Sequence, residues 1–414
     1  MRIAIVGAGV SGLVVAHLLG REHDVTVFEA AEYAGGHTNT IRVDTPNETH
    51  QVDTGFIVFN DRNYASFERL LARLGVASQP STMTFSVSDE RRDFEYSGGS
   101  PNGLFAKRAH LVTPWFHRMV ADLVRFNRAA RMLLRDGGDG PSLGTWLEQQ
   151  RFSRPFIDKL IVPQASAVWS ADPRQMWTFP ARFMAEFFDN HGMLSIRGRP
   201  QWRTVRGGSA RYVDALTSRL ARPVRLATPI RSITRHDDHV LVAPRDGDAE
   251  AYDQVVLATH SDQALALLAD ATDREHEVLG SIPYQPNEAV LHTDVGMLPR
   301  RRRAWASWNY HLMDAPGSQT TVTYHMNRLQ SLRAEREFCV TLNRTGEIDP
   351  SQVIRRIPYS HPVYTAAGVR AQARFSEISA QRRTHFCGAY WGWGFHEDGV
   401  VSALRVAERF GARL

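Results

Sequence analysis

The sequence predicts an α/β protein in which a domain with a parallel sheet is interleaved with a second, α+β domain. Three observations support this fold class. Residues 2–6 are an apolar run that leads into the pattern G-x-G-x-x-G, a second apolar run at 25–28 ends in an acid, and a glycine doublet follows at 35–36. Strand, glycine turn, helix, strand and acid in this order are typical of a Rossmann-like βαβ unit.

Each residue of the opening pattern is suited to its position for a physical reason. Gly7 permits the tight turn, Gly9 lets the backbone approach a pyrophosphate, and Gly12 lets the helix pack close to the strand. The helix N-terminus offers unpaired N–H groups to phosphates, and Ser11 adds a hydroxyl donor. Glu29 lies 22 residues after Gly7, where its carboxylate can take both ribose hydroxyls. This acid disfavours NADP, which carries a 2′-phosphate.

Composition excludes several classes of protein. The chain has 414 residues, 43% of them hydrophobic, and its two cysteines lie far apart, so we expect neither a disulfide framework nor a cysteine zinc site. The first apolar run is broken by glycines and does not resemble a signal peptide. No apolar run approaches ~18 residues, so we expect a cytoplasmic protein without a membrane span. The net charge of +5 is modest, and no nucleic-acid-binding signature is present.

The nucleotide-binding domain is predicted to form from separated segments. We assign residues 1–59, 205–268 and 382–414 to it, and residues 60–204 and 269–381 to the second domain. A strand is expected at 51–60, a glycine turn and helix at 205–216, a hairpin at 228–244, and a buried strand at 251–260. The final helix carries Val400, Leu404, Ala407 and Phe410 on one stripe.

The assembled motifs resemble the FAD-dependent amine oxidoreductase superfamily. The resemblance covers essentially the whole chain and rests on six segments, VGAGVSGL at 6–13, FEA at 28–30, GGHT at 35–38, RGG at 206–208, VVLATH at 255–260 and FCGAYWGWGFHEDGVVSA at 386–403. That superfamily includes monoamine oxidases, protoporphyrinogen oxidase, carotenoid desaturases and flavin-dependent fatty-acid isomerases. It implies a glutathione-reductase-like FAD-binding domain of the amine-oxidase type, beside a substrate domain.

The resemblance also implies a set of FAD contacts. Gly7, Gly9, Ser11 and Gly12 should hold the pyrophosphate, with Glu29 at the adenosine ribose. Gly35 and Gly36 should pass beneath the pyrophosphate and lead through His37 and Thr38 to the isoalloxazine. The remaining contacts are Ile230 at the adenine, Gly388 by the ribityl chain, and the N–H groups of a closing helix that begins near Gly399 and Val400, directed at flavin N1 and O2. Independently of the resemblance, the glycine-spaced turn that carries Tyr390, Trp391 and Trp393 favours these rings as walls for the flavin face over core packing.

A closer resemblance is to a bacterial subgroup of predicted NAD/FAD-binding oxidoreductases. Its signatures are GGHTNT, VDTGFIVFN, FFDNHG, RPQWRTVRGGS, RAWASWNYH and FCGAYWGWGFHEDG, all of which stand in this sequence. Members of that subgroup are associated with the formation of cyclopropane, branched or furan fatty acids. The amine-oxidase branch uses a late lysine near flavin N5, whereas the only lysines here are Lys107 and Lys159. This departure disfavours the usual arrangement for amine oxidation.

Four residues are candidates for the chemistry, because the flavin would supply the redox step and the protein would manage protons. His37 could donate to the flavin or act as a base, although a role as a cofactor contact is favoured. His396, Glu397 and Tyr390 border the final helix and are candidates for polar groups of the pocket. Asp398 is expected to cap that helix.

Other patterns favour structural roles. Helix 114–135 is expected to carry Trp115, Met119, Leu123, Phe126, Ala130 and Leu133 on its buried face, and a solvated arginine face is favoured over one that rests on anionic lipid. The run RRRR at 300–303 favours a solvated turn over a headgroup site. Phe183, Phe187 and Phe188 favour core over an acyl tunnel. His236 to His239 favour a hairpin tip over metal ligands.

The leading functional hypothesis is a flavoenzyme that desaturates a lipid acyl chain by hydride transfer to flavin N5. The alternatives are a redox-neutral double-bond isomerase, an amine oxidase, and a non-catalytic flavoprotein that presents lipid to a partner enzyme. The expected partners are therefore a fatty-acyl substrate, the inner face of a membrane as a peripheral contact, and a lipid-modifying enzyme.

Overall fold

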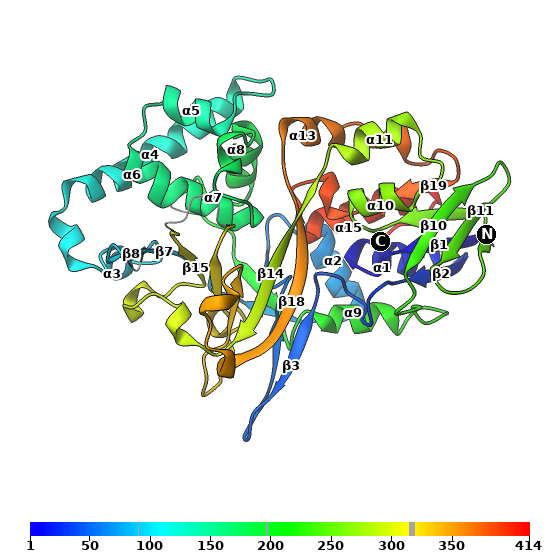
Figure 1. Ribbon diagram of the computed structural model, residues 1–414, viewed down its shortest axis with the longest axis horizontal. Helices are drawn as coiled ribbons and strands as arrows, with labels where there is room; N and C mark the ends of the chain where they lie inside the picture. Colours follow the sequence, from blue (N-terminus) through cyan, green and yellow to red (C-terminus); the bar gives the residue numbers. More distant parts are fainter. Residues whose placement is uncertain (90, 196–197, 314–318) are drawn as a thin grey trace.

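The computed structural model describes residues 1–89, 91–195, 198–313 and 319–414. Figure 1 shows a parallel sheet with its helices at one end of the molecule, a lobe of helices at the other, and a large sheet between them. The two long strands β14 (Tyr284–His292) and β18 (Val353–Pro362) run through the middle.

The parallel sheet has the order β19-β13-β1-β2. Its strands are β1 (Arg2–Val6), β2 (Asp24–Phe28), β13 (Gln254–Leu257) and β19 (Thr384–Phe386). Strand periodicity directs Ile3 and Ile5 to one face and Ala4 and Val6 to the other, and each face is covered by its own hydrophobic core. The predicted strand at 2–6 is confirmed residue for residue.

Helices cover the face of Ile3 and Ile5, and a small antiparallel sheet lies over the other face. The helices are α1 (Val10–Leu19), α2 (Ala65–Leu74), α9 (Ala210–Thr217) and α15 (His396–Arg409). The second face packs against β10 (Ile230–Arg235), β11 (Val240–Pro244) and β12 (Glu250–Tyr252), together with α10 (Ser261–Leu267), α11 (Asp273–Gly280), α13 (Ala366–Gln372) and α14 (Phe375–Ile378).

Two expectations about this region differ from the structure. The predicted strand at 51–60 is interrupted, because β4 (Thr49–Asp53) pairs with β3 (Thr40–Asp44) and β5 (Phe59–Asn60) pairs with β9 (Trp202–Val205). The predicted domain boundaries also differ, because the boundary at 59 places α2 in the second domain, yet Phe67, Leu70 and Leu71 of α2 pack in the core of the nucleotide-binding lobe. The segment 269–381 was likewise assigned to the second domain, yet its helices α11, α13 and α14 pack against the other face of the parallel sheet. The amphipathic pattern of α2 shows that it has an apolar face, but not which core that face joins.

The central sheet has seven strands in the order β18-β14-β17-β16-β15-β7-β8. Besides β14 and β18 it contains β7 (Phe85–Asp89), β8 (Phe94–Ser97), β15 (Trp308–His311), β16 (Val322–His325) and β17 (Cys339–Leu342). All neighbours are antiparallel except β15 and β7. The short strand β6 (Ser78–Pro80) pairs with β9 in a separate three-stranded sheet of order β5-β9-β6, and the short helix α12 (Met326–Leu329) follows β16.

The helical lobe packs against this sheet and shares its hydrophobic core. It contains α3 (Pro101–Leu104), the 3₁₀ turn η1 (Arg108–Val112), α4 (Pro114–Arg135), α5 (Leu143–Gln149), α6 (Arg154–Phe156), α7 (Val162–Trp169) and α8 (Ala181–Asn190). The prediction that Trp115 is buried is wrong. Phe116 is buried instead, because its ring stacks on His110 of η1 at 4.2 Å between centroids.

Residues 236–239 form the tip of the β10–β11 hairpin, and no group of metal-ligating side chains is found in the described part of the chain. Phe183, Phe187 and Phe188 are buried in α8. No helix within the described ranges combines the length and apolar character needed to cross a bilayer.

Candidate functional site

One large cavity, of about 1810 Å³, runs between the parallel sheet, the central sheet and the helical lobe. Pockets for a single small ligand typically measure roughly 300–1,000 Å³, so this cavity has room for a cofactor and a substrate together. One end lies at the glycine turn after β1, and the other lies among side chains of α4 and α7.

The glycine turn forms the first end of the cavity. Gly7 has φ +103° and Gly35 has φ +125°, conformations that other residues rarely adopt. Gly35 N–H donates to the carbonyl of Ala8, so the doublet lies directly on the first turn. An added Cβ on Gly12 would overlap the carbonyl oxygen of Gly7, whereas an added Cβ on Gly9 would meet nothing within 4 Å. Gly9 therefore leaves open space at the N-terminus of α1.

Glu29 marks the end of β2 on the rim of the cavity. Its two carboxylate oxygens accept the N–H groups of Ala8 (2.8 Å) and Ala31 (2.9 Å). These bonds fix the carboxylate, and each oxygen keeps a lone pair for a further donor such as a ribose hydroxyl. Ser11 behaves differently from the prediction, because its hydroxyl donates to the carbonyl of Gly399 at 2.9 Å and ties α1 to α15.

The final helix begins three residues earlier than predicted. Because α15 starts at His396, the N–H of Gly399 donates to the carbonyl of Phe395, and that of Val400 lies within the helix ladder. The free N–H groups of the first turn therefore belong to residues 396–398. Asp398 caps the helix as expected, accepting the N–H of Phe395 at 2.9 Å.

Two of the predicted residues near this helix have structural partners. Both carboxylate oxygens of Glu397 accept N–H groups at the start of α2, from Ser66 (2.9 Å) and Phe67 (2.8 Å). Glu397 lies outside the cavity lining, so we do not retain it as a catalytic candidate. Thr38 is buried outside the cavity lining. Its hydroxyl and that of Tyr212 both contact His396 Nε2, at 2.8 and 2.9 Å.

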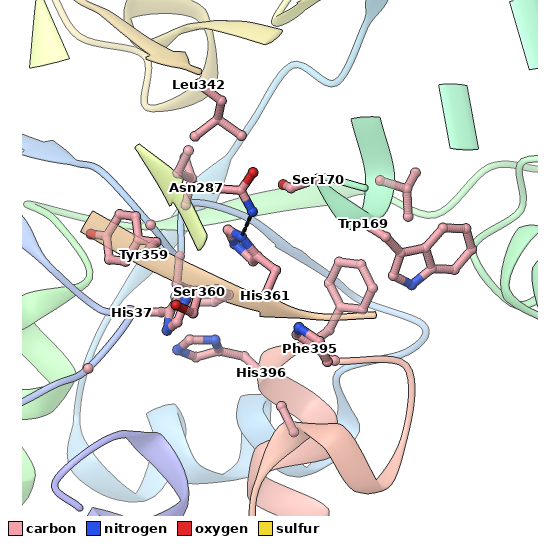
Figure 2. A pocket seen from close by; sticks show the side chains of 18 of the residues that line it. His37, Trp169, Ser170, Asn287, Leu342, Tyr359, Ser360, His361, Phe395 and His396 are labelled. Atoms are coloured by element: carbon pink, nitrogen blue, oxygen red, sulfur yellow. Dashed lines mark hydrogen bonds between the residues drawn. The ribbon is translucent and has the colours of Figure 1, made fainter. Parts of the chain in front are cut away.

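Figure 2 shows that His37, His361 and His396 converge on the middle of the cavity. His37 comes from the segment after the glycine doublet, His361 from β18 and His396 from α15. Burial lowers the pKa of His37 to about 4 and that of His361 to about 3. Both rings are therefore neutral at pH 7.

Hydrogen bonds hold His37 and His361 in opposite tautomers. The amide of Asn343 accepts the N–H of Glu288, and its Nδ2 donates to Asn287 Oδ1 at 2.7 Å. Asn287 Nδ2 consequently donates to His361 Nδ1 at 2.8 Å, which leaves the ring proton on Nε2. His37 is bonded to the backbone of Ser360, while its buried Nε2 has no partner within the described residues. His361 thus offers a donor and His37 an acceptor, with ring centroids 5.3 Å apart.

The structure brings most of the predicted site residues to this cavity. The lining includes Gly7, Gly9, Ser11, Glu29, Gly35, Gly36, His37, Ile230, Gly388, Tyr390, Trp393 and His396. It does not include Gly12, Thr38, Glu397, Gly399 or Val400. Tyr390 is buried, and its ring packs against that of Trp391 at 4.9 Å between centroids.

Sequence reasoning missed the wall that the central sheet contributes. Tyr359 stacks on His37 at 4.8 Å, and His361 and Asn287 lie beside it. His260, at the N-terminus of α10, also lines the cavity and stacks on Tyr284. Tyr359 and His361 are two residues apart, and this period-two spacing was a signal that both lie on one face of a strand.

Comparison with known proteins identifies the family. The model of the "Flavin containing amine oxidoreductase" family matches residues 10–294. The chain belongs to this family.

The chain is similar to known proteins both in sequence and in three-dimensional structure. The "Putative flavin-containing monoamine oxidase AofH" of Mycobacterium tuberculosis is 25% identical over 274 residues, which are 60% of this chain and 55% of the relative. The chain thus matches about half the length of that relative. Among solved structures, cyclohexylamine oxidase from Brevibacterium oxydans has a TM-score of 0.72 at 15% identity, covering 99% of both chains. A fatty acid isomerase from P. acnes has a TM-score of 0.68 at 16% identity, covering 99% of this chain and 98% of the other.

These similarities confirm the predicted superfamily, the fold class and the FAD cofactor. The finer bacterial subgroup stays a prediction. The cavity fits an FAD at its glycine end, since the open space over Gly9, the fixed Glu29 carboxylate and the left-handed Gly36 form a cradle that side chains would fill. When bound, the flavin supplies the acceptance of a hydride.

Proposed function

We propose that this protein is an FAD-dependent oxidoreductase that removes hydrogen from the apolar chain of an acyl-lipid substrate. The observation that carries the proposal is the composition of the second arm of the cavity, the part that extends into the helical lobe. Its lining includes Met83, Phe85, Tyr96, Leu104, Met119, Val120, Leu123, Leu160, Val168, Phe187 and Met193.

The positions of the charged side chains in the cavity lining favour a substrate whose chain carries no charge. Within the described lining of the whole cavity the carboxylates are Glu29, at the cofactor end, and Glu288, which is exposed and accepts the Thr345 hydroxyl. Neither lies in the apolar arm, and both lysines of the chain lie outside the lining. A protonated amine buried there would lack a counter-ion, whereas a hydrocarbon chain gains about 0.8 kcal/mol per buried CH₂ group.

The two histidines provide the proton chemistry that forming a double bond requires. Loss of a hydride from one carbon and of a proton from its neighbour leaves a carbon–carbon double bond. His37 Nε2 is buried and has a free lone pair, so we assign it the proton. His361 Nε2–H is a fixed donor, so we assign it to a polar group of the substrate such as a carboxylate or ester oxygen.

The test is anaerobic mixing of the FAD-loaded protein with acyl substrates and, separately, with a panel of primary and secondary amines. Loss of the visible flavin absorbance with a fatty acid or phospholipid, and not with amines, is the expected result. Reduction by amines alone would contradict the proposal. With deuterium on the donor carbon, loss of label from the lipid indicates net oxidation, whereas its return to the product would assign a redox-neutral isomerase.

A matched pair of variants tests the apolar arm. Met119 lines the cavity, and Val124 lies on the exposed face of the same helix. Met119→Trp should lower kcat/KM for long acyl chains at least about tenfold, because it fills the space that the chain needs. Val124→Trp should leave kcat/KM unchanged. Equal effects of the two substitutions would show that the arm does not hold the substrate.

A further inference from the structure

The corner formed by α3, η1 and the start of α4 exposes apolar side chains to solvent. Leu111, Val112 and Trp115 are 51%, 83% and 39% exposed. They occupy neighbouring positions on η1 and on the first turn of α4. In Figure 1 this corner is at the opposite end of the molecule from β1 and β2. Three large apolar side chains gathered at one tip form a surface that water solvates poorly.

The structure joins this corner to the arginine run at 300–303, about 190 residues away in the sequence. Arg303 Nε donates to the carbonyl of Ala106 at 2.6 Å. Arg301 and Lys107 share the carboxylate of Asp93, with N···O distances of 2.9 and 3.1 Å. The turn that carries Arg302 therefore lies beside the exposed apolar tip.

The charge of this combined surface is strongly positive. Residues 91–118 and 300–303 contain nine Lys and Arg residues against two acids, Asp93 and Glu95. Arg301 contacts both acids, and hydrogen bonds from Arg301 and Lys107 lower the pKa of Asp93 to about 2. Arg92 and Arg118 pair with Asp89 and Asp122, which lie just outside these segments, and with those two acids included the cations still outnumber the acids.

The inner side of the same corner lines the apolar arm of the cavity. Leu104 of α3 and Met119, Val120 and Leu123 of α4 contribute to the lining. The substrate end of the cavity therefore lies beneath the exposed tip, with α3 and the first turns of α4 between them.

We propose that Leu111, Val112, Trp115 and the surrounding arginines form a docking surface for an anionic lipid bilayer. The apolar tip enters the interfacial region, and the cations contact lipid phosphates, a combination typical of peripheral membrane proteins. This arrangement places the apolar arm of the cavity next to the hydrocarbon of the membrane. The docking surface stands independently of the proposed reaction, because binding is measured without turnover.

Cosedimentation with lipid vesicles tests the surface. The FAD-loaded protein is mixed with vesicles of phosphatidylcholine alone or with about one third phosphatidylglycerol. We expect binding to the anionic vesicles, weakened by ~0.5 M NaCl because salt screens the cations. A wild-type protein that binds the anionic vesicles no better than the neutral ones would overturn the proposal.

Variants separate the apolar and ionic contributions. The double variant Leu111→Asp/Val112→Asp should lower partitioning at least about tenfold, since two apolar side chains no longer enter the membrane. Arg300→Gln/Arg302→Gln should remove most of the preference for phosphatidylglycerol. Leu226→Asp is the matched control, because Leu226 is 40% exposed in the nucleotide-binding lobe. An equal loss of binding by this control would refute the assignment of the surface.

Self-association is the competing outcome. Gel filtration over a range of protein concentrations shows whether two copies of the chain cover the tip. If a dimer forms that Leu111→Asp/Val112→Asp dissociates, and no vesicle binding is seen, the surface is a self-association site and the membrane proposal is wrong.

Discussion

Gly9 and Gly12 lie three residues apart, yet the structure predicts opposite consequences for the same substitution. Gly9 has φ −73° and ψ −177°, a conformation open to any residue, and a methyl group added there would meet no protein atom within 4 Å. Gly9→Ala should therefore leave the stability of the apoprotein unchanged, or raise it by up to about 1 kcal/mol through the unfolded state. The added methyl projects into the space assigned to the pyrophosphate.

The expected loss of FAD affinity follows from that overlap. Forcing one extra methyl group into a packed contact costs about 1–3 kcal/mol, which corresponds to roughly 5- to 150-fold in Kd. Gly12→Ala differs, because its Cβ would overlap the carbonyl oxygen of Gly7 and approach Ala258 Cβ to 3.1 Å. Neither backbone can move cheaply, so this variant should lose about 3 kcal/mol or more of the free energy of unfolding.

Two assays separate these effects. Urea unfolding of the apoprotein measures stability, and titration with FAD, followed by flavin fluorescence, measures affinity. Gly346→Ala is the control, because a Cβ there also meets nothing within 4 Å and the residue lies outside the cavity lining. If Gly9→Ala binds FAD as tightly as the wild type does, or is as unstable as Gly12→Ala, then the space over Gly9 is not the pyrophosphate site.

Four further predictions follow from the buried polar groups. His37→Gln should keep its FAD but lower kcat about 10²- to 10⁴-fold, as stopped-flow reduction would show; an unchanged rate would exclude His37 as the base. Asn287→Ala should release His361 from its tautomer, lower kcat/KM about tenfold and move the pH profile of kcat/KM, whereas a purely structural role would leave that profile in place. Glu275→Ala should lower the free energy of unfolding by about 3–5 kcal/mol, because the guanidinium of Arg235 is then buried without one of its carboxylates. Recovery of stability in the double variant Arg235→Met/Glu275→Leu would support this explanation, and a loss of stability below about 1 kcal/mol in Glu275→Ala would contradict it. The folded-state pKa values of His37 and His361 lie below the unfolded value, so the contribution of these neutral rings to stability is complete above about pH 6.5. As the pH falls toward 4, the free energy of unfolding should decrease by roughly 1.4 kcal/mol per pH unit for each ring. Urea midpoints that stay constant from about pH 7 to 5 would refute this pH dependence.

Local patterns in the sequence were sufficient to predict the cofactor-binding end of the protein. The glycine pattern, the apolar runs and Glu29 lie within 36 residues, and steric rules for glycine and strand periodicity act over such short distances. The strand at 2–6, the hairpin after residue 228 and the closing helix were predicted for the same reason. Helix boundaries were less certain, and α15 starts at His396 because Asp398 caps it from within the first turn.

The substrate end depends on contacts between residues far apart in the chain. The tautomer of His361 is fixed by Asn287 on β14 and by Asn343 beyond β17, and no local pattern reports such a relay. Glu397 looked like a pocket acid, but the start of α2 lies close enough to take both of its oxygens.

The sequence alone therefore determined that the chain builds a dinucleotide cradle, because that cradle is a short-range consequence of glycine sterics and strand order. Only the tertiary structure decided which histidines share a cavity, and that an arginine run and an apolar tip lie at one corner. Those arrangements depend on how strands and helices from separate segments pack, and packing is not encoded in any single stretch of residues.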